Sequence, residues 1–312
     1  MNNLTLKLLE HRLKTLARLF ISDFHYREAR FIKTFGFRPD MTDPKTFNEK
    51  LMYRMVQSPV PHFTELADKV RARQIVRERV GSQYLVPLVG VWRHPEDIPL
   101  DIMPDRFVLK CSHDSGSAVV CRDRATHDFA ATRRWLNYRL KRNMYNHSRE
   151  WQYRHITPQI IAEALLDFSQ DRCDGFTPEN WRLHCFHGTP RFLEVEYMSD
   201  SGVRHSAIYD PAWNRLPVRM GYPALPVETA APLCLQELLR VAATLTAGLD
   251  YCRADFYVCG GNILFSEFTL TPSNGREVFT PDEWDLEFGR HWQLAPQDIP
   301  TPDSVPDMAG RS

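Results

Sequence analysis

The sequence has no excess of charge and no long hydrophobic run, and each absence excludes a class of protein. Its 312 residues include 39 Lys and Arg against 39 Asp and Glu, so the formal net charge is zero and nothing global attracts nucleic acid. No run approaches the roughly 18 apolar residues that a membrane helix requires. With 43% hydrophobic and 25% charged residues, the composition is that of a soluble globular protein with one complex domain or two ordinary ones.

Cysteine is scarce and has no framework spacing. Seven Cys, an odd number, favour a reducing compartment over a disulfide-stapled secreted protein. The beginning of the sequence lacks the long apolar region and small-residue cleavage site of a secretory signal, so we expect a cytoplasmic protein. The Cys spacing does not suit zinc, and neither a G-x-S-x-G nor an H-E-x-x-H motif is present. Buried reduced thiols are therefore the better interpretation.

The most informative stretch is Arg253 to Pro272, RADFYVCGGNILFSEFTLTP. Two runs rich in aromatic and β-branched residues flank Gly260-Gly261 and predict a β-hairpin. Side chains alternate along a strand, so a two-residue turn would put Asp255 and Glu267 on opposite faces. A three-residue loop, Gly260 to Asn262, would place them directly across from each other, and this is the loop that we expect. Two facing carboxylates on an apolar sheet repel unless a cation such as Mg²⁺ lies between them.

The first part of the chain predicts helices. Residues 4–33 carry leucines at three- and four-residue spacings, with basic side chains over much of the remaining surface. Such a helix either lies on a membrane surface or packs on its own domain with a solvated basic face, and we favour the second. Thr46 and Glu49 have capping-box spacing and open another helix. Residues 65–79 form a further helix with clustered basic side chains, of which Lys69, near its start, could reach a phosphate.

The middle of the chain has the pattern of β-strands. Strands at 106–112 and 118–122 flank a small polar loop, His113 to Ser117, and Lys110 lies just before it. Backbone N–H groups and Ser hydroxyls beside a Lys are what a phosphate-covering loop requires, although an ordinary polar hairpin gives the same pattern. Residues 126–150 predict a helix with a basic, aromatic surface, which we interpret as a solvated face or a local site for an anionic substrate.

The second half of the chain combines strands with one apolar helix. Glu163 stands alone in an apolar run and marks the mouth of a pocket or the end of a strand. Two more strands follow at 181–188 and 191–198, and a helix at 232–248 leads into the hairpin. The segment after Trp292 is rich in Pro and poor in apolar residues, so we expect it to be disordered.

Taken together, these pieces resemble the ATP-grasp superfamily, and within it the TupA-like ATP-grasp family of surface-polysaccharide biosynthesis. The segments that carry the resemblance are FNEKL, FVLKCSHDSG, CFHG and RADFY…SEFTLTP, within roughly residues 35–290. The resemblance implies an α+β protein with the ATP-grasp fold, in which two α+β subdomains clasp ATP after an N-terminal helical segment. The implied limits are 1–65 for the helical segment, 66–160 for the small subdomain with the phosphate loop, 161–292 for the C-terminal subdomain with the metal site, and 293–312 for a disordered tail.

The resemblance also implies ATP and Mg²⁺ as cofactors and a role for each site residue. Lys69 and Lys110 would hold ATP phosphates, the loop at 113–117 would close over them, and the backbone at 163–166 would meet the adenine. Arg253, together with Lys110, would be catalytic, because a cation offsets the charge that develops when a phosphoryl group moves to a carboxylate. The implied ATP-binding residues are Lys69, Lys110, His113, Asp114, Ser115, Gly116, Ser117, Glu163, Ala164, Leu165, Leu166 and Arg182. The implied metal ligands are Asp255, Glu267 and Thr269.

Three features depart from the wider superfamily pattern. Thr269 occupies a position where many ATP-grasp ligases have an Asn, and the TupA-like proteins share this Thr. Arg182 stands near the start of the CFHG strand, where a basic residue is expected, and it supplies the charge without the reach of a Lys. Helices replace the α/β domain that usually precedes the ATP-grasp core, so the acceptor cannot be carried over from the superfamily.

The function implied is an ADP-forming ligase: ATP phosphorylates a carboxylate, and an amine attacks the acyl phosphate to form an amide. The expected partners are a small-molecule or glycan substrate with a carboxylate, and an amine co-substrate, with no nucleic acid. The carboxylate would belong to a uronic acid or an amino acid, and the product to a capsule, O-antigen or teichuronic-type polymer. A peripheral membrane or partner-enzyme contact through the basic N-terminal helix is a further expectation.

Other functions stay open at this point. A kinase would transfer the phosphoryl group to a hydroxyl and needs a general base, for which Glu194, Glu196 and His184 are candidates. A glycosyltransferase would use metal-binding carboxylates to hold a sugar nucleotide, which Asp255 alone does not exclude. A non-catalytic scaffold docked on a membrane enzyme is disfavoured, because a degenerate enzyme is expected to lose some of the charged site residues.

Overall fold

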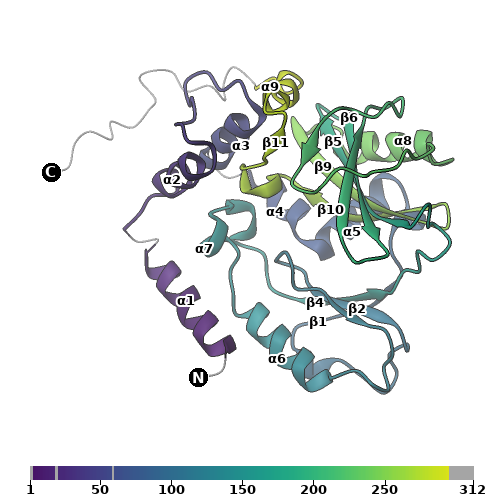
Figure 1. The fold of residues 1–312 in the computed structure, drawn as a ribbon. Coiled ribbons are helices and arrows are strands. Elements are labelled where there is room, and N and C mark those ends of the chain that lie inside the picture. Colours follow the sequence, from purple (N-terminus) through teal and green to yellow (C-terminus); the bar gives the residue numbers. More distant parts are fainter. Residues whose placement is uncertain (1–2, 18–19, 58–59, 295–312) are drawn as a thin grey trace.

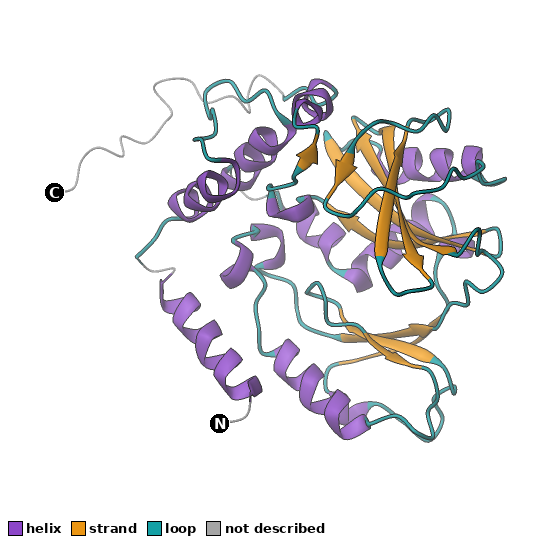
Figure 2. Cartoon of the chain, viewed as in Figure 1, coloured by secondary structure: helices purple, strands orange, loops and turns teal. Residues whose placement is uncertain are grey.

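Two antiparallel β-sheets lie one above the other, with helices on their outer sides (Figures 1 and 2). The computed structural model describes residues 3–17, 20–57 and 60–294. The strands, in chain order, are β1 (Leu88–Trp92), β2 (Phe107–Cys111), β3 (Val119–Cys121), β4 (Ile160–Ala164), β5 (Phe176–Phe186), β6 (Thr189–Ser199), β7 (Arg204–Tyr209), β8 (Arg219–Met220), β9 (Tyr251–Cys259), β10 (Asn262–Thr269) and β11 (Phe279–Thr280). The smaller sheet has the order β1-β4-β2-β3, the larger has the order β10-β9-β5-β6-β7, and β8 pairs with β11.

Helices surround these sheets and complete the predicted α+β class. The α-helices are α1 (Asn3–Ala17), α2 (Asp23–Phe35), α3 (Phe47–Val56), α4 (Pro61–Ala67), α5 (Lys69–Arg79), α6 (Phe129–Leu140), α7 (Tyr145–Ser148), α8 (Leu235–Thr246) and α9 (Glu283–Arg290). Short 3-10 turns are η1 (Ser82–Tyr84), η2 (Pro95–Asp97), η3 (Trp151–Tyr153) and η4 (Pro272–Asn274). Within the described ranges, none of the helices has the length and apolar character needed to span a bilayer.

Each sheet buries one face under helices and leaves its other face for the cleft between the sheets. On β2, Phe107 and Leu109 pack against Leu136 of α6. On β5, Leu183 belongs to the core that includes Leu238 of α8. Side chains alternate along a strand, so the residues between these apolar positions point into the cleft. The charged residues of the strands therefore gather between the sheets.

An aromatic cluster fixes the N-terminal helices to the end of the larger sheet. Phe47 of α3 is fully buried and contacts the rings of Tyr251 and Phe288. The predicted capping box that opens α3 is confirmed, because the Thr46 hydroxyl accepts from the Glu49 N–H and the Glu49 carboxylate accepts from the Thr46 N–H. This cap sets the start of α3 and thereby places Phe47 over the sheet.

Three helices that the sequence predicted as continuous are divided, and those predictions are wrong. Residues 4–33 form α1 and α2, and residues 126–150 contain α6 and α7. The helix expected at 65–79 is split at Asp68, whose carboxylate accepts from the Val70 N–H and caps α5. A side chain that caps a new helix competes with continuation of the previous one. The expected disordered tail falls mostly on residues 295–312, which lie outside the described residues.

The first helix packs with the side opposite to the one expected. Helix α1 contacts α6 and α7, and His11, at 7% exposure, faces that contact. The leucines Leu6, Leu9, Leu13 and Leu16 are instead exposed. The interpretation of a helix that buries its leucines and leaves a basic face in solvent is therefore wrong.

The hairpin of β9 and β10 has a different turn from the one expected. Its connection is the two-residue turn Gly260-Gly261, in which both glycines have positive φ (56° and 78°), as the tight turns of two-residue hairpins require. A β-bulge then leaves Ser266 unpaired and shifts the register by one residue. Glu267 consequently pairs with Asp255. The three-residue loop was wrong, but the predicted juxtaposition of the two carboxylates is confirmed.

Candidate active site

A row of charged side chains crosses the inner face of the five-stranded sheet. Strand pairing aligns Glu267 with Asp255, and Asp255 in turn with Arg182. Arg182 pairs with Glu194 on the next strand, β6. Arg253 lies two residues from Asp255 on β9 and therefore shares its face. Four neighbouring strands thus bring the predicted metal, catalytic and basic residues onto one surface.

Arg253 and Asp255 form a buried ion pair at the centre of this row. Two hydrogen bonds join them, from Nε to Oδ1 at 2.8 Å and from Nη2 to Oδ2 at 2.7 Å. The Thr269 hydroxyl donates to Asp255 Oδ2 at 3.1 Å and accepts from Arg253 Nη2 at 3.3 Å. Arg253 and Asp255 are 7% and 5% exposed. The hydroxyl of Thr269 therefore lies beside the carboxylate, where the resemblance implied a metal ligand.

Lys69 connects the hairpin to the polar loop of the small sheet. It is the first residue of α5, and its Nζ lies 3.1 Å from Glu267 Oε2. The same Nζ donates to the backbone carbonyl of Asp114 at 2.7 Å. One ammonium group thus contacts the hairpin of the larger sheet and the polar loop next to the small sheet, where an anionic ligand between the sheets would need a cation.

Lys110 takes part in a second charge network, on the small sheet. Its Nζ lies 2.6 Å from Glu163 Oε2 on β4, and Arg73 Nη1 of α5 lies 2.5 Å from Glu163 Oε1. Arg73 also donates to the carbonyl of Val86 at 2.8 Å. Sequence reasoning missed Arg73, for which the only signal was the cluster of basic residues in α5. Glu163 holds Lys110 in the cleft and is itself neutralised from both sides.

The two facing carboxylates have opposite pKa shifts. Burial raises the pKa of Asp255, against the opposing charge of Arg253. Burial also works against the ionised form of Glu267, but the charge of Lys69 outweighs it and lowers the pKa. For Lys110, burial disfavours the charged form, yet Glu163 raises the pKa and keeps the ammonium protonated. A divalent cation entering between the two carboxylates would favour the ionised form of both.

Arg182 neutralises the two glutamates of β6. Its Nη1 lies 2.6 Å from Glu196 Oε1 and 3.4 Å from Glu194 Oε1, and both glutamates are buried. Burial works against the ionised form of Glu194, but the contacts with His184 and Arg182 lower its pKa to about 2. A carboxylate this acidic is a weak general base. Arg182 remains a predicted contact of ATP, and the structure adds that it organises this pair.

The loop at 113–117 uses most of its side chains internally. The carboxylate of Asp114 accepts from Arg139 Nε at 2.6 Å, and the hydroxyl of Ser117 accepts from the Cys111 N–H at 2.8 Å. His113, Asp114 and Ser117 are all buried, whereas Ser115 and Gly116 are exposed. The loop is therefore held from below by α6, and its tip alone is free to cover an anion. The predicted helix surface at 126–150 gave no indication that Arg139 would do this.

A cavity of about 480 Å³ lies between the two sheets. Leu165 and Leu166, from the segment after β4 that was predicted to meet the adenine, line it together with Arg106, the residue before β2, and Tyr257 of β9. Because of strand alternation, Tyr257 shares a face with Asp255. The cavity therefore opens along the same face of the larger sheet that carries the charged row.

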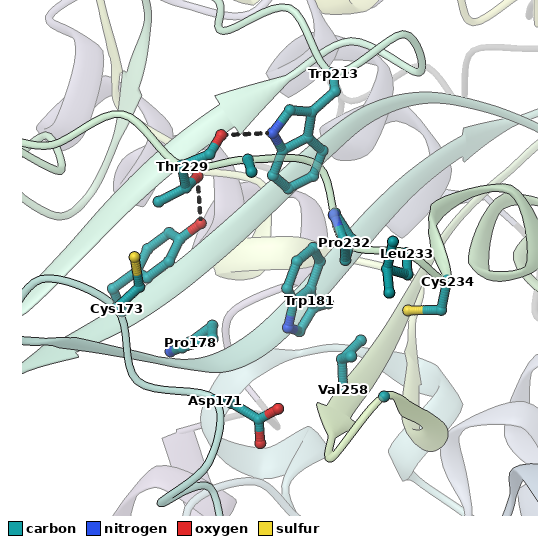
Figure 3. A pocket seen from close by; sticks show the side chains of 13 residues that line it. Asp171, Cys173, Pro178, Trp181, Trp213, Thr229, Pro232, Leu233, Cys234 and Val258 are labelled. Atoms are coloured by element: carbon teal, nitrogen blue, oxygen red, sulfur yellow. Dashed lines mark hydrogen bonds between the residues drawn. The ribbon is translucent and has the colours of Figure 1, made fainter.

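A second cavity, of about 670 Å³, lies on the opposite face of the larger sheet (Figure 3). Trp181 and Trp213 stack in its wall at a centroid distance of 5.6 Å, and Trp213 Nε1 donates to the carbonyl of Thr229 at 2.9 Å. The cavity is mainly apolar, and of the described residues that line it none belongs to the predicted site. Charge separates the two cavities: charged side chains of both signs line the inter-sheet cavity, whereas among the described residues that line the second cavity only Asp171 is charged.

The donor set suits Mg²⁺ bound together with phosphates. In the part of the chain that the structure describes, no group of three or more His, Cys, Asp or Glu side chains could hold a metal alone. Asp255 and Glu267 provide two carboxylates, with the Thr269 hydroxyl beside them. Mg²⁺ commonly uses one or two carboxylates and completes its octahedron with water and substrate phosphates. The residues present therefore fit the ion, with the remaining ligands coming from a nucleotide.

The family and its relatives are found by comparison with known proteins. A family model described as TupA-like ATPgrasp matches residues 49–293. Similar solved structures include D-alanine–D-alanine ligase from Bacillus anthracis complexed with ATP (13% identity, TM-score 0.37, covering 67% of this chain and 54% of that one). Another is the same ligase from Helicobacter pylori (14% identity, TM-score 0.37, covering 73% of this chain and 61% of that one). A third is an ADP complex of N5-carboxyaminoimidazole ribonucleotide synthetase (14% identity, TM-score 0.39, covering 69% of this chain and 47% of that one).

These solved structures are distant likenesses, and the chain spans about half to three fifths of their length. No curated protein matches the sequence. The family model covers well over half of the chain and confirms both the predicted family and the predicted ATP-grasp fold.

Proposed function

The chain belongs to the TupA-like ATP-grasp family, and from this premise we propose that it is an ADP-forming ligase that joins a carboxylate to an amine. One observation carries the proposal: Asp255 and Glu267 face each other across the hairpin, each in contact with a cation. Mg·ATP would exchange these contacts, because phosphates bring negative charge to Arg253 and Lys69 while the metal takes up the carboxylates. Every buried charge then keeps a partner of opposite sign.

The inter-sheet cavity is the proposed position of the nucleotide. Leu165 and Leu166 would meet the adenine, and Lys110 and Lys69 would hold the phosphates. The exposed loop tip at Ser115 and Gly116 would cover them with backbone N–H groups. Asp255, Glu267 and Thr269 would hold Mg²⁺, which when bound supplies charge neutralisation on the phosphate oxygens.

The proposed reaction has two steps. A carboxylate oxygen attacks the terminal phosphorus of ATP, the bond from that phosphorus to the bridging oxygen breaks, and ADP leaves. The amine nitrogen then attacks the carbonyl carbon of the acyl phosphate, the C–N bond forms, and phosphate leaves as the amine loses a proton. Arg253 offsets the negative charge that develops on oxygen, and its pairing with Asp255 orients the guanidinium beforehand.

The substrates follow from the family association alone. We propose a uronic acid or an amino acid as the carboxylate, within the synthesis of a capsule, O-antigen or teichuronic-type polymer. The seven cysteines are all unpaired, in keeping with a reducing cytoplasm.

A nucleotide and product assay tests the proposal. The protein is incubated with ATP, Mg²⁺ and a panel of uronic acids and amino acids, each with and without an amine. ADP and an amide that form only when carboxylate and amine are both present would support the ligase. Nucleotide-sugar turnover would point to a glycosyltransferase instead, and the absence of Mg·ATP binding would contradict the proposal.

A kinase is the alternative that this assay separates most sharply, since its product is a phosphorylated sugar. The structure offers little support for a base in such a reaction. Glu194 and Glu196 are held by Arg182, and the pKa of Glu194 is lowered to about 2. The buried ring of His184 hydrogen-bonds Tyr251, and burial lowers its pKa.

A further inference from the structure

Three arginines converge where α2 meets the loop that follows η4. Arg27 and Arg30 lie one turn apart on α2, and Arg276 lies in the loop that follows β10 and η4. They line a crevice together with Phe31, Met52, Asn274 and Gly275, and this crevice is too tight for a water molecule unless the half-buried side chains of Arg30 and Arg276 move. No carboxylate is among the described residues of this lining.

Arg27 is buried without a counter-charge. It is 3% exposed, and its one hydrogen bond runs from Nη1 to the sulfur of Met55 at 2.7 Å. Its Nε and Nη2 have no partner, and neither does Nε of Arg30 or of Arg276. Within the described parts of the chain, none of the three forms an ion pair. Several guanidinium N–H groups at the crevice therefore have no hydrogen-bond acceptor among the described residues.

The carboxylates nearest to this cluster are committed elsewhere. Asp23 binds Arg149 at 2.8 Å and accepts from the Tyr145 hydroxyl. Glu150 accepts from the hydroxyl of Thr271. Burial lowers the pKa of Arg27 to about 10, and the attraction of Glu150 and Asp23 does not offset it. A buried cation in this state is costly unless a ligand supplies the missing charge.

We propose that the arginine crevice (Arg27, Arg30 and Arg276) opens by rotation of the half-buried Arg30 and Arg276 side chains and binds an oxyanion group, a carboxylate or a phosphate. Guanidinium forks bind both groups through paired, charge-assisted hydrogen bonds, and their planar geometry favours such oxyanions over chloride. An oxyanion here satisfies the donors that no protein group reaches.

The position of the crevice points to the acceptor substrate as the source of this group. Arg276 lies on the loop that leaves β10 after Glu267 and Thr269, and the same loop contains Thr271, which joins Glu150 and Gln152. A substrate that reacts near Arg253 and carries a second anionic group could reach the crevice along this loop. This assignment to the acceptor rests on the proposed ligase function, whereas the oxyanion site itself does not.

Thermal unfolding in the presence of anions tests the site. The protein is saturated with Mg²⁺ and a non-hydrolysable ATP analogue, so that all three phosphate positions of the nucleotide site are filled, and inorganic phosphate or acetate is titrated against chloride at constant ionic strength. We expect phosphate, acetate or both to raise the melting temperature, because a ligand that binds only the folded state stabilises it. Comparing the two arms tells which oxyanion the crevice prefers.

Variants separate this site from a general salt effect. Arg30→Gln and Arg276→Gln should weaken the anion's apparent affinity by about tenfold or more, while the exposed Arg38→Gln on the same N-terminal segment should not. Arg27→Met should leave the melting temperature in anion-free buffer unchanged or raise it, and should remove the response to anions. A response that is absent from the wild type, or equal in all four variants, would overturn the proposal. If the ligase assignment alone is wrong, the anion response persists and amide formation is not found.

A second inference rests on α1, which stands apart from the sheets in Figure 1. Its packed side is polar: His11 stacks on His147 at a ring distance of 5.3 Å, and Thr15 and Lys14 are only partly exposed. The opposite side carries Leu6, Leu9, Leu13 and Leu16, each about half exposed, and Phe20 continues them at 86% exposure. A surface helix normally turns its apolar stripe inward, so this stripe lacks the cover that such helices have.

The charge around this leucine stripe (Leu6, Leu9, Leu13 and Leu16) is positive. Lys7 and Arg12 of α1 are exposed, and so are Arg134 of the neighbouring helix α6 and Lys141, which follows that helix. Glu10, the acid of this helix, is engaged with Lys14 at 2.6 Å. Apolar side chains flanked by cations match the interface of a bilayer that contains anionic lipids.

We infer that α1 lies on the surface of an anionic membrane, with the leucine stripe at the level of the headgroups. Such a contact would hold the catalytic cleft beside the membrane surface. Vesicle co-sedimentation tests it: binding to phosphatidylcholine vesicles that contain about a third phosphatidylglycerol should be strong, and should weaken in high salt and on pure phosphatidylcholine.

The leucine variant gives the decisive comparison. Leu9→Ser combined with Leu13→Ser should weaken vesicle binding by about tenfold or more, whereas Leu233→Ser, at a fully exposed leucine beside α8, should bind as the wild type does. Melting temperature and Mg·ATP binding should stay unchanged in both. Undiminished vesicle binding by the double variant would contradict the inference. So would a wild type that avoids vesicles and instead forms dimers that the double variant loses.

Discussion

Around the β9–β10 hairpin the buried cations contact carboxylates, whereas among the described residues the arginine crevice contacts none. Arg253 binds Asp255, and Lys69 binds Glu267. Arg27 has the sulfur of Met55 as its hydrogen-bond partner. The difference distinguishes two kinds of binding site. In the paired network, a ligand binds by replacing the protein groups that the charged side chains contact. In the arginine crevice, a ligand binds by supplying the counter-charge that the side chains lack.

The largest expected effect comes from breaking the paired network. Asp255→Asn and Glu267→Gln should each lower turnover by at least about 10³-fold, because the charge on the transferred phosphoryl group then loses its metal. Asp171→Asn is the matched control, since Asp171 accepts from the Gly260 N–H on the same hairpin but contacts none of the site cations. Steady-state rates of ADP release measure all three variants. Equal losses of turnover in the control and in the site variants would mean that each substitution disrupts the fold of the hairpin and not the metal site.

The next effect is on the free energy of unfolding, and it compares a buried charge of the paired network with one of the arginine crevice. Glu163→Gln leaves Arg73 and Lys110 without their shared counter-charge and should destabilise the protein by about 3 kcal/mol. Arg27→Met removes a cation that has no counter-charge, and should be neutral or stabilising. Urea unfolding of both variants gives the comparison. Similar losses of stability would show that the distinction between paired and unpaired charges does not hold.

A smaller effect separates the two lysines of the cleft from surface lysines. Lys69→Met and Lys110→Met should each weaken Mg·ATP binding by roughly tens of fold, because each removes a charge-assisted contact with phosphate. Lys45→Met is the control, since Lys45 contacts Asp43 at the surface. Calorimetric titration measures the affinities. If Lys69→Met and Lys110→Met bind Mg·ATP as tightly as the wild type, the phosphates lie elsewhere.

The smallest effect is a pH dependence that arises from a carboxylate without a cation. Asp285 accepts from the Asn48 N–H, and burial raises its pKa to about 6. A raised pKa means that the protonated form is favoured on folding, so this contribution to stability is present below pH 4 and is lost as the pH rises through about 6. Asp285→Asn should therefore add up to about 2 kcal/mol of stability at pH 8 and little at pH 4. Urea unfolding at both pH values checks the sign, and a larger gain at pH 4 would contradict it.

Much of the site could be predicted because strand alternation is local. The spacing of Arg253 and Asp255 fixes their common face, whatever the rest of the fold does. The pairing of Asp255 with Glu267 depended on register, and the sequence carried no clear signal for the bulge at Ser266. The loop length was therefore wrong while the pairing was right, because the bulge and the shorter turn offset each other.

Contacts between distant segments could not be predicted. Arg27 and Arg276 are separated by most of the chain, and only the fold brings them to one crevice. The same holds for Arg73 with Glu163 and for Arg139 with Asp114. In a single sequence Arg27, Arg73 and Arg139 look like parts of solvated helix faces, because pattern and composition do not record a partner that lies far along the chain.

Metal binding in the presence of nucleotide tests the central claim most directly. Mn²⁺, which electron paramagnetic resonance detects, replaces Mg²⁺ and is titrated into the protein with ATP in the absence of acceptor. The account predicts that the wild type and Asp171→Asn form a protein-bound Mn·ATP complex, and that Asp255→Asn and Glu267→Gln do not. A bound complex of undiminished affinity in both site variants would contradict the assignment of the facing carboxylates.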